Sequence, residues 1–431
     1  MREENRTKDK KIMLITPMLH QGGFERICVM TARALGQRRD TEAVIVVFSM
    51  EDIAFDVSGL TVIDLNLKAR DGRLRKILNI IRRSIKLTAL QKKLGTDISY
   101  SFGTTANIAN SLSRGAKKKI SACHSFEEIR GGVYMKLISR CTDRVLCCSK
   151  KMADLVQESY GFPGVEALWN PCDIRGILAQ SRKEPDKDIA FFKENGKILV
   201  SMGREDDVKG FWHLLKIFRR VYEEEENVGL AVIGEGGFEE YRRLARELGV
   251  EKRVFFAGLK KNPFPYLRES DIYLLTSLSE GLPNALVEAL ALSLPVVSAN
   301  CLSGPAEILH GDFKEAEAQK EVFLGDYGVL VPALSPEKNL SVRWEPEGEA
   351  FRREEPGKLP CCGEEKKRIA PEAAGKRIHL EEAEGKFAAA VLMLLRDEGL
   401  YKGYQEKALA RAEDFSTENY MEGLLSCMEK L

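Results

Sequence analysis

The chain has 431 residues, of which 44% are hydrophobic and 30% are charged. This length is too great for one ordinary hydrophobic core, and the composition excludes a disordered or fibrous protein. The net charge of +1 hides an asymmetry, because residues 1–175 hold 30 Lys and Arg against 19 Asp and Glu, whereas residues 176–431 hold 36 against 46. We therefore expect two domains, the first with an anionic partner such as a phospholipid surface or a diphosphate-bearing acceptor.

The amino-terminal segment MREENRTKDK is charged, and the apolar run at residues 11–16 is too short for a signal peptide or a membrane span. This pattern predicts a cytosolic protein. The ten cysteines include adjacent pairs at Cys147/Cys148 and Cys361/Cys362 but no Cys-x2-Cys spacing, so free or buried thiols are expected rather than a zinc site. No motif indicates nucleic-acid binding.

Short apolar runs alternate with stretches of helical spacing along most of the chain. The first set of runs lies at residues 11–16, 44–48, 98–102 and 145–148, and the second at 198–202, 230–233, 254–257, 272–276 and 295–298. Alternation of this kind is typical of parallel sheets with crossover helices. The predicted fold class is α/β, with two Rossmann-like halves.

The first of these runs leads into a glycine pair, Gly22 and Gly23, just before an apolar helical pattern. Paired glycines allow a phosphate to approach the start of a helix, although a tight turn has the same appearance. The segment is not Gly-x-Gly-x-x-Gly, and neither is the later Gly-Glu-Gly-Gly at residues 234–237, so the dinucleotide-binding fingerprint is absent.

A basic amphipathic helix is predicted at residues 73–86. Its apolar residues at helical spacing are Leu74, Ile77, Leu78, Ile81 and Ile85, and its basic residues are Arg73, Arg75, Lys76, Arg82, Arg83 and Lys86. Such a helix either rests on anionic lipid, together with the lysines at 117–119, or packs its apolar side into the core and leaves a solvated basic side. The sequence favours neither interpretation over the other.

The predicted domains are 1–180, 181–405 and a final helix at 406–431 that packs back on the first domain. Asn170-Pro171 and the polar stretch 181–195 favour an interdomain linker there. Residues 333–376, with WEPEGEAFRREEPGKLP at their centre, lack the material for a core and are expected to form an exposed, partly mobile insertion.

Two loops of the second half carry the residues best suited to chemistry. After the run at 198–202 come Arg204 and Lys209, and a guanidinium with an ammonium group can neutralise a diphosphate as it departs. After the run at 272–276 comes a segment with two carboxylates and free backbone amides at a helix start, composed of Glu280, Gly281, Leu282, Pro283, Asn284 and Glu288. Carboxylates accept hydrogen bonds from sugar hydroxyls, and free backbone amides at a helix start bind an anion. The pattern therefore predicts a nucleotide-sugar site.

The order Gly-Gly-x-Glu-Arg, then Gly-Arg with Lys-Gly, then Glu-x7-Glu resembles the retaining glycosyltransferases of family 4, which have the GT-B fold. The resemblance covers nearly the whole chain, and Ser-Gly-Pro-Ala-Glu-Ile at 303–308 is similar to bacterial enzymes that extend polyprenyl-diphosphate-linked or capsular glycans. It implies transfer of a sugar from a nucleotide donor, with UDP the favoured nucleotide, to such an acceptor, and with retention of configuration.

The resemblance also implies the role of each matched residue. Arg204 and Lys209 would bind the donor diphosphate, Glu288 the ribose and Glu280 the transferred sugar, while the segment from Gly281 to Asn284 supplies amides. Gly22 and Gly23 would lie beside donor phosphate and acceptor, and His124 near the reacting sugar; a structural histidine is the equal alternative for His124.

No metal or other cofactor is expected, because Asp206-Asp207 is not Asp-x-Asp and solvated aspartates explain it better. Two other functions share this architecture: a non-hydrolysing nucleotide-sugar epimerase, and an inactive scaffold subunit. The complete set of donor residues disfavours the scaffold, and the Glu-x7-Glu spacing disfavours the epimerase.

Overall fold

The computed structural model describes residues 10–20, 22–51, 53–69, 71–184, 191, 194, 196–345 and 376–431. Contacts divide the chain into two units. Unit 1 comprises Met1–Ile174, Glu280–Asn284 and Ala412–Leu431, and unit 2 comprises Arg175–Ser279 and Ala285–Arg411. The first division falls at Ile174, six residues before the boundary predicted at residue 180, so helix α7 (Ile174–Ser181) lies almost wholly in unit 2.

Unit 1 is a seven-stranded parallel sheet with helices in the connections, in the order β3-β2-β1-β4-β5-β6-β7. The strands are β1 (Lys10–Thr16), β2 (Thr41–Val47), β3 (Val62–Asp64), β4 (Ile98–Ser101), β5 (Lys118–Cys123), β6 (Arg144–Cys147) and β7 (Val165–Ala167). The helices are α1 (Gly23–Gly36), α2 (Arg73–Leu94), α3 (Thr104–Leu112), α4 (Phe126–Arg130), α5 (Val133–Cys141), α6 (Lys150–Tyr160) and, from the end of the chain, α17 (Thr417–Glu429).

Alternate residues of the central strands of unit 1 point into two different cores. Ile12 and Leu14 join α1 and α17 on one face, whereas Met13 and Ile15 join α2 and α3 on the other. Successive side chains of a strand point to opposite faces, so a strand covered on both sides reads as one continuous apolar run. This explains why the sequence shows β1 so clearly.

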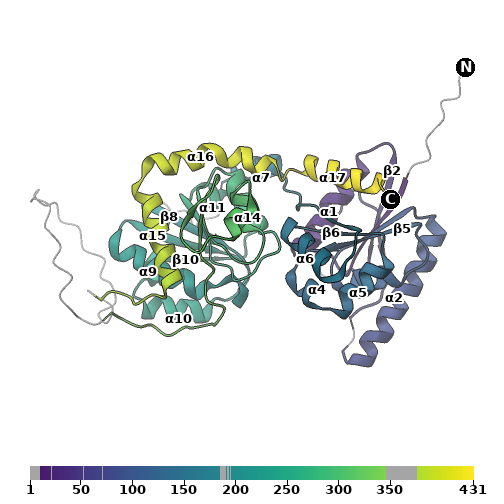
Figure 1. Cartoon of the computed structure of the whole chain (residues 1–431), viewed down its shortest axis with the longest axis horizontal. Helices are drawn as coiled ribbons and strands as arrows, with labels where there is room; N and C mark the ends of the chain where they lie inside the picture. The colour runs from purple at the N-terminus through teal and green to yellow at the C-terminus, as the bar shows by residue number, and fades with distance from the viewer. Residues whose placement is uncertain are drawn as a thin grey trace, which may run out of the picture. The chain divides into compact units, whose positions relative to one another are not determined.

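Unit 2 repeats the plan with the strand order β10-β9-β8-β11-β12-β14-β13, in which only β13 is antiparallel to its neighbour. Its strands are β8 (Lys197–Met202), β9 (Val228–Ile233), β10 (Val254–Gly258), β11 (Ile272–Leu275), β12 (Val296–Ala299), β13 (Phe323–Leu324) and β14 (Val329–Val331). Its helices, besides α7, are η2 (Asp207–Lys209), α9 (Phe211–Glu224), α10 (Glu239–Glu247), η3 (Glu251–Arg253), α11 (Phe264–Arg268), α12 (Asn284–Ala291), α13 (Pro305–Leu309), α14 (Phe313–Glu317), α15 (Glu382–Arg396) and α16 (Glu398–Glu413) (Figure 1).

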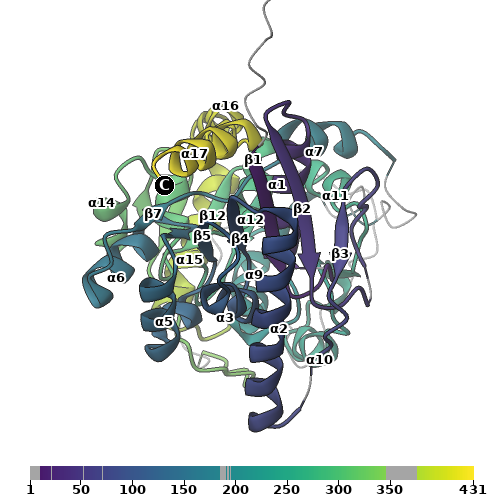
Figure 2. The same ribbon diagram turned by 90° about the vertical axis from the view of Figure 1, so that its right-hand side faces the viewer.

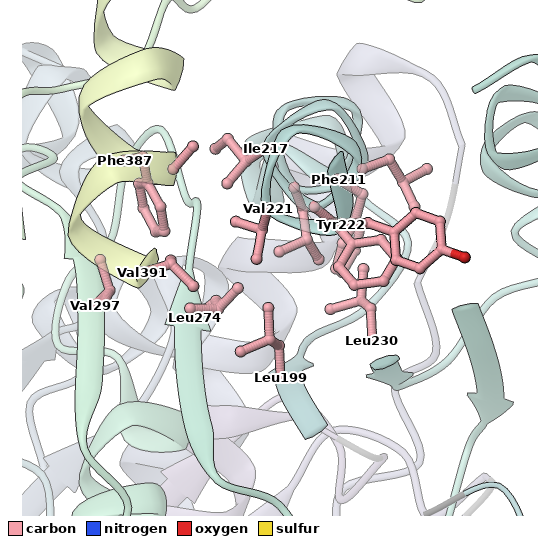
Figure 3. Packing of buried hydrophobic residues seen from close by; sticks show 14 of the residues in the cluster. Leu199, Phe211, Ile217, Val221, Tyr222, Leu230, Leu274, Val297, Phe387 and Val391 are labelled. Atoms are coloured by element: carbon pink, nitrogen blue, oxygen red, sulfur yellow. The ribbon is translucent and has the colours of Figure 1, made fainter. Parts of the chain in front are cut away.

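The main core of unit 2 lies where α9 and α15 cover the sheet. Figure 3 shows Phe387 and Val391 of α15 beside strand residues Leu274 and Val297, with Ile217 of α9 close by, and all of these side chains are buried. These residues come from segments far apart in the chain, so the core holds the two helices against one sheet face.

In both sheets the strand order reverses next to the first strand of the unit, between β1 and β4 and between β8 and β11. Loops that leave the carboxyl ends of such neighbouring strands diverge to opposite faces of the sheet, and ligands of open α/β sheets bind there. The sequence-predicted residues Gly22, Gly23, Arg204 and Lys209 all lie in the connections that follow β1 and β8, with Gly23 at the start of α1 and Lys209 at the end of η2.

The described part of the predicted insertion does not match the expectation of an exposed segment. Leu334 is buried, and Leu340, Val342 and Trp344 pack against the core of unit 2. Trp344 also pairs with Ile378 in an antiparallel bridge, which joins the two described ends of the insertion. The few apolar residues among many charges are thus enough to attach these ends, while residues 346–375 lie outside the described part of the chain.

Candidate functional site

The loop after β8, residues 203–210, is tied to the connection that leaves its neighbour β11. Thr276 Oγ1 donates a hydrogen bond to the Lys209 carbonyl oxygen (3.0 Å), and the Leu278 amide donates to the Val208 carbonyl oxygen (2.8 Å). Gly210 has a φ of 62°, and a Cβ there would lie 2.3 Å from the Thr276 carbonyl oxygen. Only glycine allows this approach without strain, so the backbone itself fixes where Lys209 projects.

The loop after β9 holds the same region from the other side. A Cβ on Gly234 would lie 1.8 Å from the Gly203 carbonyl oxygen, so the two loops are in direct backbone contact. The Glu205 amide donates to the Glu235 carbonyl oxygen (2.7 Å), and the Glu205 carboxylate accepts from the Phe238 amide (2.8 Å). Glu205 therefore anchors the loop, a role that a charged loop sequence does not reveal.

The structure brings three of the predicted donor residues to this edge of the unit 2 sheet. Arg204 is exposed, and Lys209 is partly exposed with its alkyl stem against Gly203, where a Cβ would lie 3.2 Å from the lysine Cγ and Cδ. Glu288 is only 4% exposed in the second turn of α12, the helix that follows β11. Two cations and one buried carboxylate thus belong to the connections of two adjacent strands.

The neighbouring aspartates have structural partners. Asp206 accepts a hydrogen bond from the Val208 amide (3.0 Å) as the cap of η2, and Asp207 pairs with Lys338 at 2.7 Å. Across the described residues, no group of three or more His, Cys, Asp or Glu side chains is placed to hold a metal ion.

By its contacts, the segment Glu280–Asn284 belongs to unit 1, whereas Arg204, Lys209 and Glu288 belong to unit 2. A Cβ on Gly281 would lie 2.2 Å from the His124 carbonyl oxygen and 3.0 Å from Cys148 Sγ. The Asn284 side chain lies near Gly23 and accepts a hydrogen bond from Asn170 Nδ2 (3.0 Å). Gly23, His124 and the 281–284 segment, predicted from separate motifs, therefore lie close together.

Asn170 belongs to this group of residues, although the sequence did not single it out as a site residue. The Asn-Pro pair suggested a linker, but Asn170 is 7% exposed and holds Asn284 through its amide. The signal that could have found it is its position, since it follows β7 at the same carboxyl edge of the sheet as His124.

His124 follows β5, and its two ring nitrogens are buried without a hydrogen-bonding partner in the described chain. Burial lowers the pKa of His124 to about 4, and the nearby Asn170 amide opposes the shift. The imidazole is therefore neutral at pH 7, with one ring nitrogen a hydrogen-bond donor and the other an acceptor.

Glu128, one turn further on, fixes the backbone of His124. Its carboxylate accepts from the His124 amide (2.8 Å) and from Thr104 Oγ1 (3.1 Å). Burial raises the pKa of Glu128. No motif in the sequence distinguishes this glutamate from the adjacent Glu127, because only the tertiary structure buries one and exposes the other.

At the glycine pair, Gly22 caps α1 and the side chain of Glu25 folds back toward it. A Cβ on Gly22 would lie 2.1 Å from Glu25 Oε2, so a carboxylate lies at the helix start where the sequence suggested a phosphate. A carboxylate repels phosphate but accepts hydroxyl hydrogens. This arrangement fits a sugar or acceptor hydroxyl better than the donor phosphate.

The described cysteines are all free thiols, and Cys361 and Cys362 lie outside the described residues. Of the helices that the structure describes, not one has the length and apolar character needed to span a bilayer.

Comparisons with known proteins bear on the family and the fold. Residues 182–317 match the family Glycosyl transferases group 1. An uncharacterized glycosyltransferase of Methanocaldococcus jannaschii is 30% identical over 56% of this chain and 52% of its own length. A Campylobacter jejuni relative named N-acetylgalactosamine-N,N'-diacetylbacillosaminyl-diphospho-undecaprenol 4-alpha-N-acetylgalactosaminyltransferase is 25% identical over 73% of this chain and 89% of its own.

Among solved structures, Anabaena HepE in complex with UDP-glucose is similar with a TM-score of 0.68 and 16% identity, over 98% of this chain and 100% of that one. At this identity the likeness bears on the fold, which is GT-B. The match to the Methanocaldococcus jannaschii protein spans about half of that relative, so substrates and partners are not carried over from it. The family match and the two-sheet architecture together lead to one conclusion: residues 182–317 of this chain match the group 1 glycosyl transferases, and the chain has the GT-B fold.

Proposed function

We propose that this protein transfers a sugar from a UDP-sugar to a hydroxyl of a glycan or polyprenyl-diphosphate-linked acceptor at the cytosolic face of a membrane, with retention of configuration. The observation that carries the proposal is the joining of the β8 and β11 connections at the sheet's reversal point, with Arg204 and Lys209 on one and Glu288 after the other. The Campylobacter jejuni relative's name, which contains a diphospho-undecaprenol acceptor, supports the acceptor class.

In this proposal Arg204 and Lys209 bind the diphosphate and Glu288 binds the ribose hydroxyls. Glu280 and the amides of residues 281–284 bind the transferred sugar. The bond from the anomeric carbon to the phosphate oxygen breaks and a bond to the acceptor oxygen forms on the same face, while the leaving phosphate takes the acceptor's proton. Two cations on the departing diphosphate lower the barrier because its charge grows in the transition state.

Residues of unit 1 carry the remaining roles in this proposal. Neutral His124 hydrogen-bonds a hydroxyl of the transferred sugar, and its low pKa supports this role because a charged imidazolium would lose its acceptor nitrogen. The loop at Gly22 and Gly23, with the Glu25 carboxylate beside it, binds hydroxyl groups of the acceptor.

Calorimetric titration with UDP and with uridine tests the donor site. Lys209→Ala is expected to weaken UDP binding about tenfold or more and to leave uridine binding unchanged, because only UDP has phosphates. Glu288→Gln is expected to weaken both ligands, since both carry the ribose. Lys252→Ala, which removes an exposed lysine of η3, is the matched control and should change neither.

Equal loss of UDP and uridine binding in Lys209→Ala, or unchanged UDP binding, would reject the assignment of the site. Incubation of the wild type with UDP-sugars and no acceptor separates the alternatives. Formation of an isomeric UDP-sugar would identify an epimerase, and tight donor binding without turnover on any lipid-diphosphate or glycan acceptor would identify a scaffold.

A further inference from the structure

The segment that follows β14 lies against the loop that carries Lys209. His213, just after that loop, donates from Nε2 to the Ser335 carbonyl oxygen (2.9 Å), and Asp207, within the loop, pairs with Lys338 (2.7 Å). The two contacts lie on either side of Lys209 in the chain. This part of the predicted insertion is therefore a neighbour of the proposed diphosphate site, which its charged sequence did not indicate.

Apolar side chains hold this segment in place. Leu334 is 5% exposed, and Leu340 and Val342 pack against the core of unit 2. Figures 1 and 2 show α10 at the lower side of unit 2, and the segment that follows β14 runs to the same side. Because the backbone is attached to the core both before and after Lys338, this side chain extends towards η2 and α10 from a fixed position.

The ammonium group of Lys338 joins two carboxylates from different elements. Besides Asp207 of η2 it pairs with Glu240 in the first turn of α10, and it lies 5.6 Å from the centre of the Tyr241 ring. The Lys338 side chain is 30% exposed. Partial burial opposes its charge, but the hydrogen bonds to the two carboxylates raise the pKa of Lys338, so the group is charged at neutral pH.

Asp207 has an unfavourable position for a diphosphate site. It precedes Lys209 by two residues in the single turn of η2, and a negative charge beside a bound diphosphate weakens its binding. Asp207 and Glu240 carry two negative charges, and Lys338 reduces their sum to one. Because the Asp207 side chain is 63% exposed, water and salt screen the effect, which should therefore be moderate and dependent on ionic strength.

We propose that Lys338 is a positioning residue of the donor site, which holds the Asp207 carboxylate in an ion pair and so cancels a negative charge beside the lysine that binds the diphosphate. The inference rests on the proposed function, since it needs the diphosphate at Lys209. A purely mechanical contact is the competing explanation. It differs in one respect, because it makes the loss of either partner equally harmful, whereas charge cancellation makes the loss of Lys338 harmful and the loss of the Asp207 charge harmless.

Calorimetric titration of the full chain with UDP and with uridine tests the inference. Lys338→Met keeps the length of the side chain but removes its charge, and it is expected to weaken UDP binding about fivefold at low salt and to leave uridine binding unchanged. Raising the salt concentration to about 0.5 M should reduce that difference to about twofold. Lys338→Arg keeps the charge and should bind UDP within about twofold of the wild type.

Variants of the partner residue separate charge from mechanical contact. Asp207→Asn breaks the same ion pair but removes the negative charge, so it should not weaken UDP binding. The double variant Asp207→Asn with Lys338→Met has the same net charge as the wild type and should bind UDP within about twofold of it. The matched control is Lys386→Met, because Lys386 also bridges two carboxylates of unit 2, Glu321 just before β13 and Glu382 of α15, and its loss should change neither ligand.

Unchanged UDP binding in Lys338→Met would overturn the inference, and so would equal weakening by Lys338→Met and Asp207→Asn or a difference that salt does not reduce. Lys209→Ala tests the donor site separately. If Lys209→Ala weakens UDP binding and Lys338→Met does not, the donor site stands and only the role of Lys338 fails. The melting temperature serves as the fold control and should stay within about 2 °C of the wild type in each variant of the pair.

Discussion

His124 combines a polar ring with surroundings that keep it uncharged. Its pKa is lowered to about 4 by burial, and its backbone is held by Glu128 and packed against Gly281. A neutral, rigidly placed imidazole contributes a directed hydrogen bond without the cost of reorganising water. The same burial has a consequence for stability that can be measured without any substrate.

The folded chain binds a proton at His124 more weakly than the unfolded chain, whose histidine has a pKa of 6.5. The stability contributed by neutral His124 is therefore complete above pH 6.5 and is lost as the pH falls towards 4. When the pH is lowered from 7 to 5, the free energy of unfolding of His124→Gln should fall by about 1–2 kcal/mol less than that of the wild type. Urea unfolding at each pH measures the difference, and parallel pH profiles for the two proteins would contradict the shift.

At the scale of elements, one buried pair connects three segments of unit 2 beneath the loop that carries Lys209. His213, in the first turn of α9, places Nδ1 2.6 Å from Glu384 Oε1 and Nε2 2.9 Å from the Ser335 carbonyl oxygen. Glu384 also accepts from the Glu381 amide (2.9 Å) in the capping box of α15. Because a carbonyl only accepts, Nε2 must carry the hydrogen. The pair thus joins α9, α15 and the segment after β14.

Removal of one partner of this pair should be costly. Glu384→Ala leaves His213 and the α15 cap unsatisfied, and we expect a loss of about 3–5 kcal/mol in unfolding free energy. The double variant His213→Leu with Glu384→Leu should lose less than the sum of the single variants, because neither residue is then left buried alone.

Urea unfolding measures both effects. The control in the same helix is Lys386→Ala, which breaks the pair with the 83% exposed Glu382 and should cost less than about 1 kcal/mol. Equal costs for Glu384→Ala and Lys386→Ala would show that the buried pair does not join the three segments.

At the scale of the whole molecule, the end of the chain returns to complete the first unit. Leu424 is fully buried in α17, and Tyr420 Oη lies 2.9 Å from Thr31 Oγ1 of α1. The carboxyl-terminal helix is therefore part of the core of unit 1 rather than an appendage.

Leu424→Ala should destabilise unit 1 by about 2–4 kcal/mol through the cavity it leaves. Hydrogen exchange followed by mass spectrometry is expected to become faster in peptides of β1, β2 and α1 and to stay unchanged in those of β8 to β11. Leu394→Ala, at a buried position of α15, is the converse control. Faster exchange in both units for either variant would mean that the units do not unfold separately.

Much of the fold could be predicted from the sequence because parallel strands covered on both faces read as continuous apolar runs. The strands absent from the apolar runs of the sequence analysis are β3, β7 and β14, each with three residues, β13 with two, and β5, whose first residues are lysines. Strands so short leave too few side chains to show a period.

The resemblance to the family and the types of residue at the proposed donor site follow from local patterns, because Gly-Arg, Lys-Gly and Glu-x7-Glu each lie within one loop or helix start. The tertiary structure alone decided which loops touch and which face of α2 points outward. The exposed apolar residues of α2, which are Leu74, Ile77, Leu78, Ile81 and Ile85, would have the same spacing along the sequence if they were buried. Distant partners, among them the carbonyl oxygens of Leu67 and Lys68 and the ring of Phe48, determine the rotation of α2, and no periodicity along the helix encodes their positions.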